Sequence, residues 1–81
     1  MSVSSQTHAK AALDGGICLR LNGREAAVRA ANLAALLCEL DVPQGAVAVE
    51  LNGKIISPAV FAATPLTSGD VVELVRFVGG G

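Results

Sequence analysis

The chain has 81 residues, which fits one small domain, and 52% of them are hydrophobic although only two are aromatic. Its formal net charge of −1 gives no electrostatic attraction for nucleic acid or for an anionic membrane surface. We find no apolar run near the ~18 residues of a membrane span, no signal-peptide pattern and too few cysteines for a disulfide framework. These features predict a cytoplasmic protein with reduced thiols, an aliphatic core, and no nucleic-acid or membrane partner.

The first part of the chain differs from the rest. Residues 1–16 show no apolar period, and Asp14-Gly15-Gly16 reads as a break. We expect these residues to form a disordered N-terminal extension.

A β-hairpin is predicted next. Ile17, Leu19 and Leu21 alternate with more polar residues, which is typical of a half-buried strand. Asn22-Gly23 is a strong signal for a two-residue turn, because both central positions of a type I′ turn need a positive φ. Residues 25–28 then form the returning strand.

A single helix follows the hairpin. Asn32 is a good N-cap, since its side chain can accept a bond from an orphan backbone N–H. One apolar stripe with helical spacing comes after it: Leu33, Leu36, Leu37 and Leu40. We expect Asp41-Val42-Pro43 to end the helix, because the residue before a proline avoids the helical region.

The second half of the chain is rich in strand signals. Residues 46–51 and 54–56 are predicted strands around a second turn at Asn52-Gly53. Residues 59–63 are predicted to be irregular, with Phe61 inward, and residues 68–70 to form a tight turn. Residues 71–77 are the longest strand-like run.

This order predicts an α+β fold, a β-grasp or ubiquitin-like roll, in which a mixed sheet of four to five strands is covered by one main helix. The last strand is expected beside the first. Residues 17–78 would form this domain, and residues 79–81 a flexible tail, because three glycines have no side chain to pack and high backbone entropy.

The two faces of the last strand differ. Val72 and Leu74 are predicted to face the helix, so Val75 and Phe77 point outward. Exposed apolar residues at one spot indicate a protein-binding patch, to which Val78 is added as a further candidate.

No catalytic or metal-binding set is predicted. Cys18 and Cys38 are expected to be partly exposed and incidental, because no histidine except His8 could activate them. Asp70 is interpreted as a turn residue. Three glutamates are interpreted as solvated surface charges: Glu39, Glu50 and Glu73.

The helix 32–40, the stretch 47–54 with Pro58 after it, and the ending 66–81 together resemble the ThiS family of sulfur carrier proteins of thiamine biosynthesis. The resemblance covers about residues 17–81. Related carriers often have an arginine after the proline, where this chain has Ala59. The first 16 residues have no counterpart in the typical pattern.

The resemblance implies a carrier rather than an enzyme. A ThiF-type enzyme would adenylate the carboxylate of Gly81 with ATP, and a sulfur donor such as a cysteine desulfurase would convert it to a thiocarboxylate. A ThiG-type thiazole synthase would then use the sulfur. The chain would bind no cofactor stably, and Gly79 and Gly80 would let an active site close around the tail. The free protein is expected to be a monomer.

Other functions remain open at this point. The same ending fits the small subunit of molybdopterin synthase or a sulfur carrier for cysteine synthesis. A ubiquitin-like modifier would use the same activated carboxylate. An S4-type RNA-binding module is less well supported, because residues 32–40 contain no lysine or arginine.

Overall fold

The computed structural model describes residues 16–77, which form one five-stranded sheet with one main helix. The predicted disordered extension lies almost entirely outside the described residues, and so do Val78 and the three glycines of the predicted tail. The elements are β1 (Ile17–Leu21), β2 (Arg24–Val28), α2 (Leu33–Glu39), a 3₁₀ helix (Gln44–Ala46), β3 (Val47–Leu51), β4 (Lys54–Ile56), a second 3₁₀ helix (Pro58–Ala63) and β5 (Val71–Arg76).

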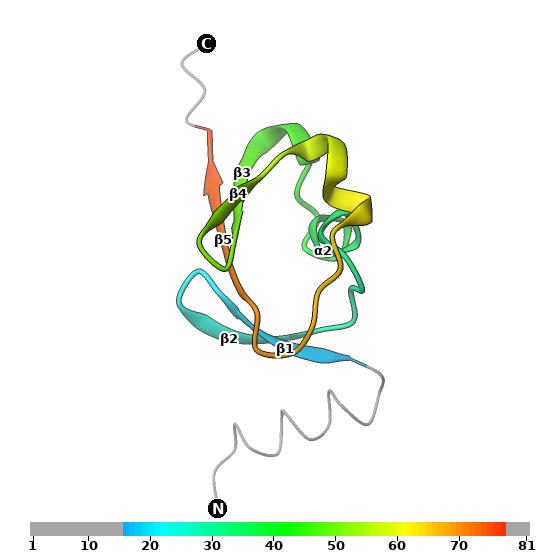
Figure 1. The fold of residues 1–81 in the computed structure, drawn as a ribbon, viewed down its shortest axis with the longest axis vertical. Helices are drawn as coiled ribbons and strands as arrows, with labels where there is room; N and C mark the ends of the chain where they lie inside the picture. The colour runs from blue at the N-terminus through cyan, green and yellow to red at the C-terminus, as the bar shows by residue number, and fades with distance from the viewer. Residues whose placement is uncertain (1–15, 78–81) are drawn as a thin grey trace, which may run out of the picture.

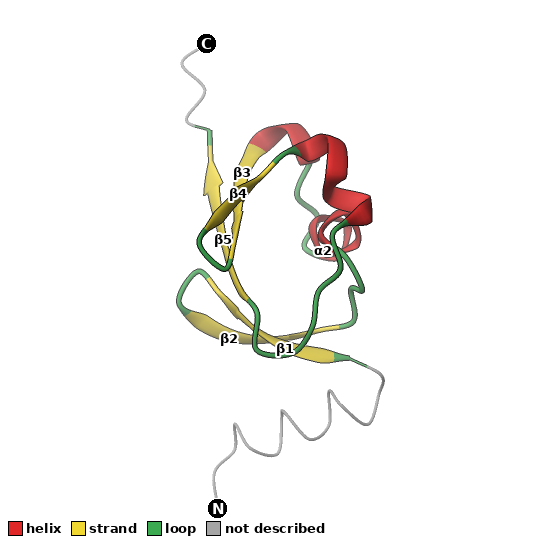
Figure 2. Ribbon diagram, in the orientation of Figure 1, coloured by secondary structure: helices red, strands yellow, loops and turns green. Residues whose placement is uncertain are grey.

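The sheet has the order β2-β1-β5-β3-β4, so the last strand lies at its centre (Figure 1). Strand β5 runs parallel to β1 and antiparallel to β3. The sheet is curved, and α2 and the two 3₁₀ helices lie on its concave side (Figure 2). The predicted β-grasp roll, with the last strand beside the first, is confirmed.

Two Asn-Gly turns fix the hairpins. Asn22 and Gly23 have φ values of 49° and 81°, and Asn52 and Gly53 have values of 51° and 86°. Positive φ at both central positions is the requirement of a type I′ turn, whose twist matches that of the flanking strands. Both predicted turns are therefore confirmed, and each sets a two-residue hairpin register.

Helix α2 begins as predicted. The N–H of Ala35 donates to the side-chain oxygen of Asn32 at 2.8 Å, which satisfies one orphan donor of the first turn. Leu33, Leu36 and Leu37 are fully buried. The apolar stripe thus faces the sheet.

The end of α2 has a different cause from the one predicted. Asp41 takes a left-handed conformation with φ of 59°. Its N–H donates to the carbonyl of Cys38 at 3.1 Å, and the N–H of Val42 donates to that of Leu37 at 2.8 Å. This is a Schellman motif, which ends the helix before Pro43 can act.

The segment predicted to be irregular is a 3₁₀ helix at Pro58–Ala63. Ser57 caps it, because its hydroxyl accepts from the N–H of Ala59 at 3.3 Å. Phe61 is 1% exposed, so its predicted inward position is confirmed. The ring completes an otherwise aliphatic core between the sheet and α2, made with Leu19, Val28, Val47, Val49, Leu66 and Val72 among others.

Candidate functional site

The candidate site is built on the end of β5, the strand that leads into the last residues of the chain. Its neighbours β1 and β3 bind it from both sides. The N–H of Phe77 still donates to the carbonyl of Ala46 at 3.0 Å, so the ladder with the β3 side continues to the last described residue. The sheet therefore fixes the position from which residues 78–81 continue.

The side chains of β5 alternate as predicted. Val72 is fully buried and Leu74 is half-buried against the core. Val75 and Phe77 are each 61% exposed. The predicted outward direction of these two residues is confirmed, whereas their role in binding a partner stays a prediction.

Sequence analysis missed a third residue of the same face. Ile55 on β4 is 80% exposed, more than any other large hydrophobic residue among 16–77. It pairs with Glu50, which in turn pairs with Glu73 on β5, so all three point to the outer side of the sheet. The signal was present, because a two-residue turn at Asn52-Gly53 by itself places Ile55 opposite Glu50.

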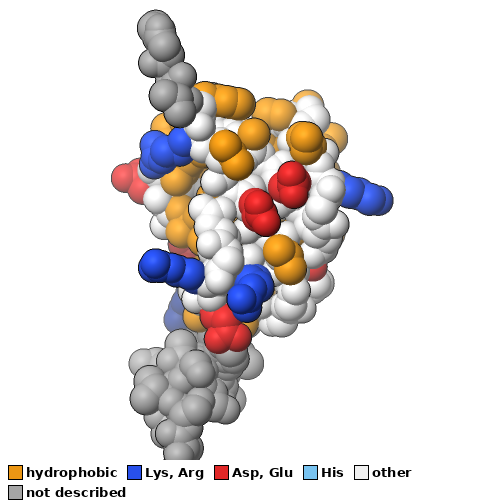
Figure 3. Space-filling model, turned by 90° about the vertical axis from the view of Figure 1, so that its left-hand side faces the viewer, with side chains coloured by type: hydrophobic (Ala, Val, Ile, Leu, Met, Phe, Trp, Pro, Cys, Tyr) orange, Lys and Arg blue, Asp and Glu red, His pale blue; other side chains and the backbone are white. Residues whose placement is uncertain are grey.

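Apolar and acidic side chains meet on this outer face. A shallow hollow on it is lined by Ala48, Val49, Glu50, Ile55, Glu73 and Val75. Figure 3 shows hydrophobic side chains around a pair of neighbouring acidic ones on this side of the molecule. We call the outward residues of β3, β4 and β5 the outer sheet face: Ala48, Glu50, Ile55, Val71, Glu73, Val75 and Phe77.

Two of the predicted surface charges have more specific positions. Glu50 is half-buried rather than fully solvated, and it lies directly opposite Glu73. Glu39 is exposed, but its two carboxylate oxygens accept from the N–H of Arg29 at 3.0 and 3.2 Å. That contact ties the last turn of α2 to the segment after β2. Asp70 is a turn residue as predicted, since it accepts from the N–H of Thr67 at 2.9 Å.

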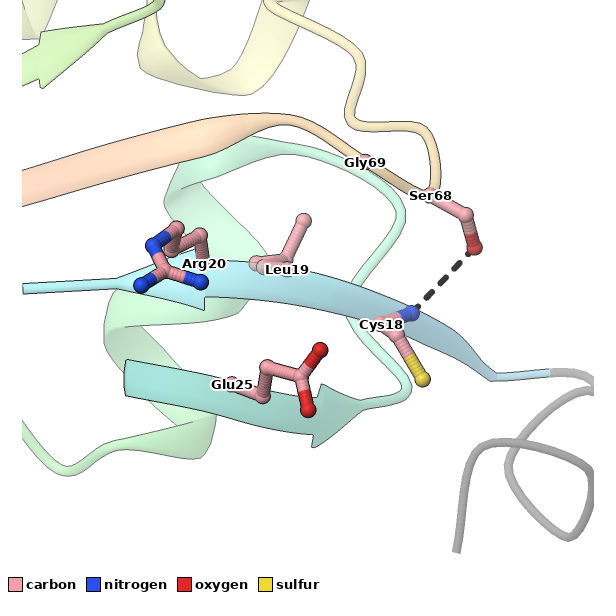
Figure 4. A pocket seen from close by; sticks show the side chains of 6 residues that line it. All are labelled: Cys18, Leu19, Arg20, Glu25, Ser68 and Gly69. Carbon is pink, nitrogen blue, oxygen red and sulfur yellow. Dashed lines mark hydrogen bonds between the residues drawn. The ribbon is translucent and has the colours of Figure 1, made fainter. Parts of the chain in front are cut away.

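The two thiols lie on separate elements. Cys38 is exposed on α2, and Cys18 is half-buried on β1, in agreement with the prediction that both are partly exposed. Cys18 borders a second hollow with Arg20, Glu25, Ser68 and Gly69 (Figure 4). Its N–H donates to the hydroxyl of Ser68 at 3.2 Å, which joins β1 to the turn before β5. The Ser68 hydroxyl therefore has a structural role, because it accepts this hydrogen bond from β1.

The part of the chain that the structure describes contains no group of three or more His, Cys, Asp or Glu residues that could hold a metal ion. Within the same residues no helix is long and apolar enough to cross a membrane. The candidate site within residues 16–77 is the end of β5 beside an apolar and acidic face of the sheet.

Comparisons with known proteins agree with this description. The crystal structure of the thiamine biosynthesis protein ThiS from Geobacter metallireducens is 40% identical, with a TM-score of 0.68 over 80% of this chain and 100% of that one. A solution structure of a thiamine biosynthesis protein from the same organism gives 40% identity and a TM-score of 0.66, over 80% of this chain and 88% of that one.

A relative of a different size matches as well. A thiazole synthase from Paramagnetospirillum magneticum is 41% identical over 64 residues. The match covers 78% of this chain, which spans only a fifth (20%) of the length of that protein.

The strand order and the solved relatives define a β-grasp domain like that of the thiamine biosynthesis protein ThiS. The ThiS family model matches residues 19–81, which is most of the sequence. The chain belongs to the ThiS family. The family and the solved relatives support a role as a sulfur carrier.

Proposed function

We propose that this chain carries sulfur for the thiazole ring of thiamine as a thiocarboxylate on Gly81. The observation that supports this most directly is the family match, which extends through the glycine ending to residue 81. The structure is also consistent with this role, because β5 is held in the sheet up to Phe77, four residues before Gly81.

The chemistry needs an external enzyme. A carboxylate is a poor acyl donor until one of its oxygens leaves easily. A ThiF-type enzyme would let the Gly81 carboxylate attack the α-phosphorus of ATP, so that pyrophosphate leaves and an acyl adenylate forms. The terminal sulfur of a persulfide supplied by a cysteine desulfurase would then displace AMP to give an acyl disulfide. A thiol would cleave its S–S bond by exchange, so that a disulfide leaves and the thiocarboxylate remains on Gly81.

Different residues near the end of the chain would have different roles in this chemistry. Gly79 and Gly80 carry no Cβ, so a narrow active site can close around them. Val75, Phe77 and Val78 would bind the enzyme and hold the tail in register. ATP would be bound by the enzyme, and the carrier would keep no cofactor of its own. A thiazole synthase is the proposed acceptor, a choice supported by the similarity to part of a protein of that name.

Intact-protein mass spectrometry tests the proposal. The chain ending at Gly81 is incubated with ATP, a ThiF-type enzyme and a sulfur donor. We expect a mass gain equal to the replacement of one oxygen by sulfur, and thiazole formation when thiazole synthase and its other substrates are added.

Two controls make the result specific. Deletion of Gly81, or addition of one residue after it, should abolish the mass gain while the circular dichroism spectrum and melting temperature stay unchanged. If an enzyme that is active on another carrier gives no mass gain with the intact chain, the proposal is wrong. Transfer of sulfur to a molybdopterin precursor instead of thiazole would reassign the pathway.

A further inference from the structure

The outer sheet face carries a feature that fold stability does not explain. Glu50 on β3 and Glu73 on β5 are direct cross-strand partners. Directly opposed side chains have their Cβ atoms about 4.5–5.5 Å apart, and like charges at this distance are destabilising. The sheet therefore keeps two carboxylates together at a cost.

The acidic pair lies among apolar side chains. Ile55, which is 80% exposed, pairs with Glu50, and Val75, which is 61% exposed, lies two residues from Glu73 along β5. Both border the same hollow as the two carboxylates. Four of the five exposed large hydrophobic residues of the described chain belong to this face: Ile55, Val71, Val75 and Phe77. Such a concentration marks an interaction surface.

The charged side chains at the outward positions of β3, β4 and β5 are all acidic. No lysine or arginine occupies an outward position of β3, β4 or β5 within residues 16–77. Lys54 and Arg76 pair with Leu51 and Val47, so their strand positions have the opposite parity. On the neighbouring β1, Arg20 points outward beside Val71, and its partner on the other side is Glu25 of β2.

This arrangement disfavours a second copy of the chain as the occupant. A two-fold dimer brings the same patch of both copies together. Burying Ile55 and Val75 in this way would place four carboxylates in one desolvated interface, where unpaired charges are strongly unfavourable.

We propose that the outer sheet face binds a surface of the adenylating enzyme that is apolar except for a basic side chain, an arginine or a lysine, directed at Glu50 and Glu73. The inference rests on the proposed function, because it takes the adenylating enzyme as the partner. An arginine fits best, since its planar guanidinium has five donors and can bond both carboxylates at once. Ile55 and Val75 would exclude water from these bonds, as residues surrounding a charged contact do in protein interfaces.

The test measures binding of the full chain to a ThiF-type adenylating enzyme by calorimetry, and adenylation kinetics with the carrier as the varied substrate. The double variant E50Q/E73Q keeps size and hydrogen-bonding atoms but removes both charges. Charge-assisted bonds contribute enough that we expect a Kd about ten- to a hundredfold higher, and a smaller dependence of Kd on salt. The rate at saturating carrier should not change.

Matched controls separate the face from general effects. Asp41→Asn removes an exposed charge on the helix-end turn, and Val60→Ser removes an apolar group that is 46% exposed on a 3₁₀ helix. We expect both to bind like the wild type, whereas Ile55→Ser binds several-fold more weakly. Melting temperatures identify any variant whose loss of binding reflects unfolding.

The outcomes distinguish the two proposals. If E50Q/E73Q binds as tightly as the wild type, or more tightly, while thiocarboxylate still forms, this inference is wrong and the proposed function stands. A wild-type dimer that Ile55→Ser dissociates would also contradict it, because the face would then be self-complementary. If the wild type accepts no sulfur at all, both proposals fail.

Discussion

The side-chain oxygen of Asn22 accepts a hydrogen bond from the backbone N–H of Leu74 at 2.7 Å, across 52 residues of sequence. Strand β1 ends at Leu21, so its backbone ladder with β5 stops at Val72. The Asn22 side chain continues that ladder by one further bond. Asn52, in the other hairpin turn, does the same from the opposite side, because its side-chain oxygen accepts from the N–H of Val71 at 2.9 Å.

We therefore predict that Asn22→Gly lowers the free energy of unfolding by about 1 kcal/mol, the usual net contribution of one hydrogen bond. Glycine accepts the positive φ of the turn, so the substitution tests the contact to β5 rather than turn geometry. Urea denaturation measures the change. Asn22→Asp keeps an acceptor and a residue tolerant of this conformation, and it should stay closer to the wild type. Equal losses in the two variants would contradict the assignment.

Much of this fold is readable from local sequence. A type I′ turn needs positive φ at two adjacent positions, so Asn22-Gly23 and Asn52-Gly53 identify the hairpins without tertiary information. The alternation along β5 is equally local, and it correctly predicts that Val75 points outward. The 3₁₀ helix at Pro58–Ala63 is harder to predict, because short 3₁₀ segments depend on the packing of a single anchor, here Phe61.

The candidate site is only partly readable, since the register between β3 and β5 is set by a long connection rather than by a tight turn. For this reason the opposition of Glu50 and Glu73 is invisible in the sequence. The same holds for the second role of Asn22 and Asn52. Their turn function is encoded by the next glycine, but their bonds to β5 exist only once the sheet is assembled.

The Schellman motif at the end of α2 gives a prediction with a definite sign. Asp41 occupies the left-handed position with φ of 59°, which costs a residue with a Cβ roughly 1–2 kcal/mol. Glycine removes this strain, although it raises the entropy of the unfolded chain. We expect Asp41→Gly to raise the free energy of unfolding by about 0.5–1 kcal/mol.

Thermal and urea denaturation of this variant provide the measurement. Asp41→Ala serves as the control, because it keeps the Cβ while removing the carboxylate, and it should not stabilise the protein. If alanine and glycine have the same effect, the charge rather than the backbone conformation controls this end of the helix.

The two phenylalanines of the chain should behave oppositely. Phe61 is 1% exposed in the core, whereas Phe77 is 61% exposed on the outer sheet face. Removal of a buried phenylalanine ring typically costs 3–5 kcal/mol, which is a large part of the stability of a small domain. We expect Phe61→Ala to approach complete unfolding, and Phe77→Ala to change the free energy of unfolding by no more than about 0.5 kcal/mol.

Affinity for the adenylating enzyme, unlike the free energy of unfolding, should depend strongly on Phe77. If this ring contacts the adenylating enzyme, Phe77→Ala raises Kd about tenfold or more, the effect of losing an aromatic contact at the centre of an interface. Calorimetric titration of the folded variant measures this directly. A strong loss of thermal stability in Phe77→Ala would mean that the ring supports the sheet edge. Wild-type affinity in a folded Phe77→Ala would remove this end of β5 from the interface, and the tail would then have to be positioned by the enzyme alone.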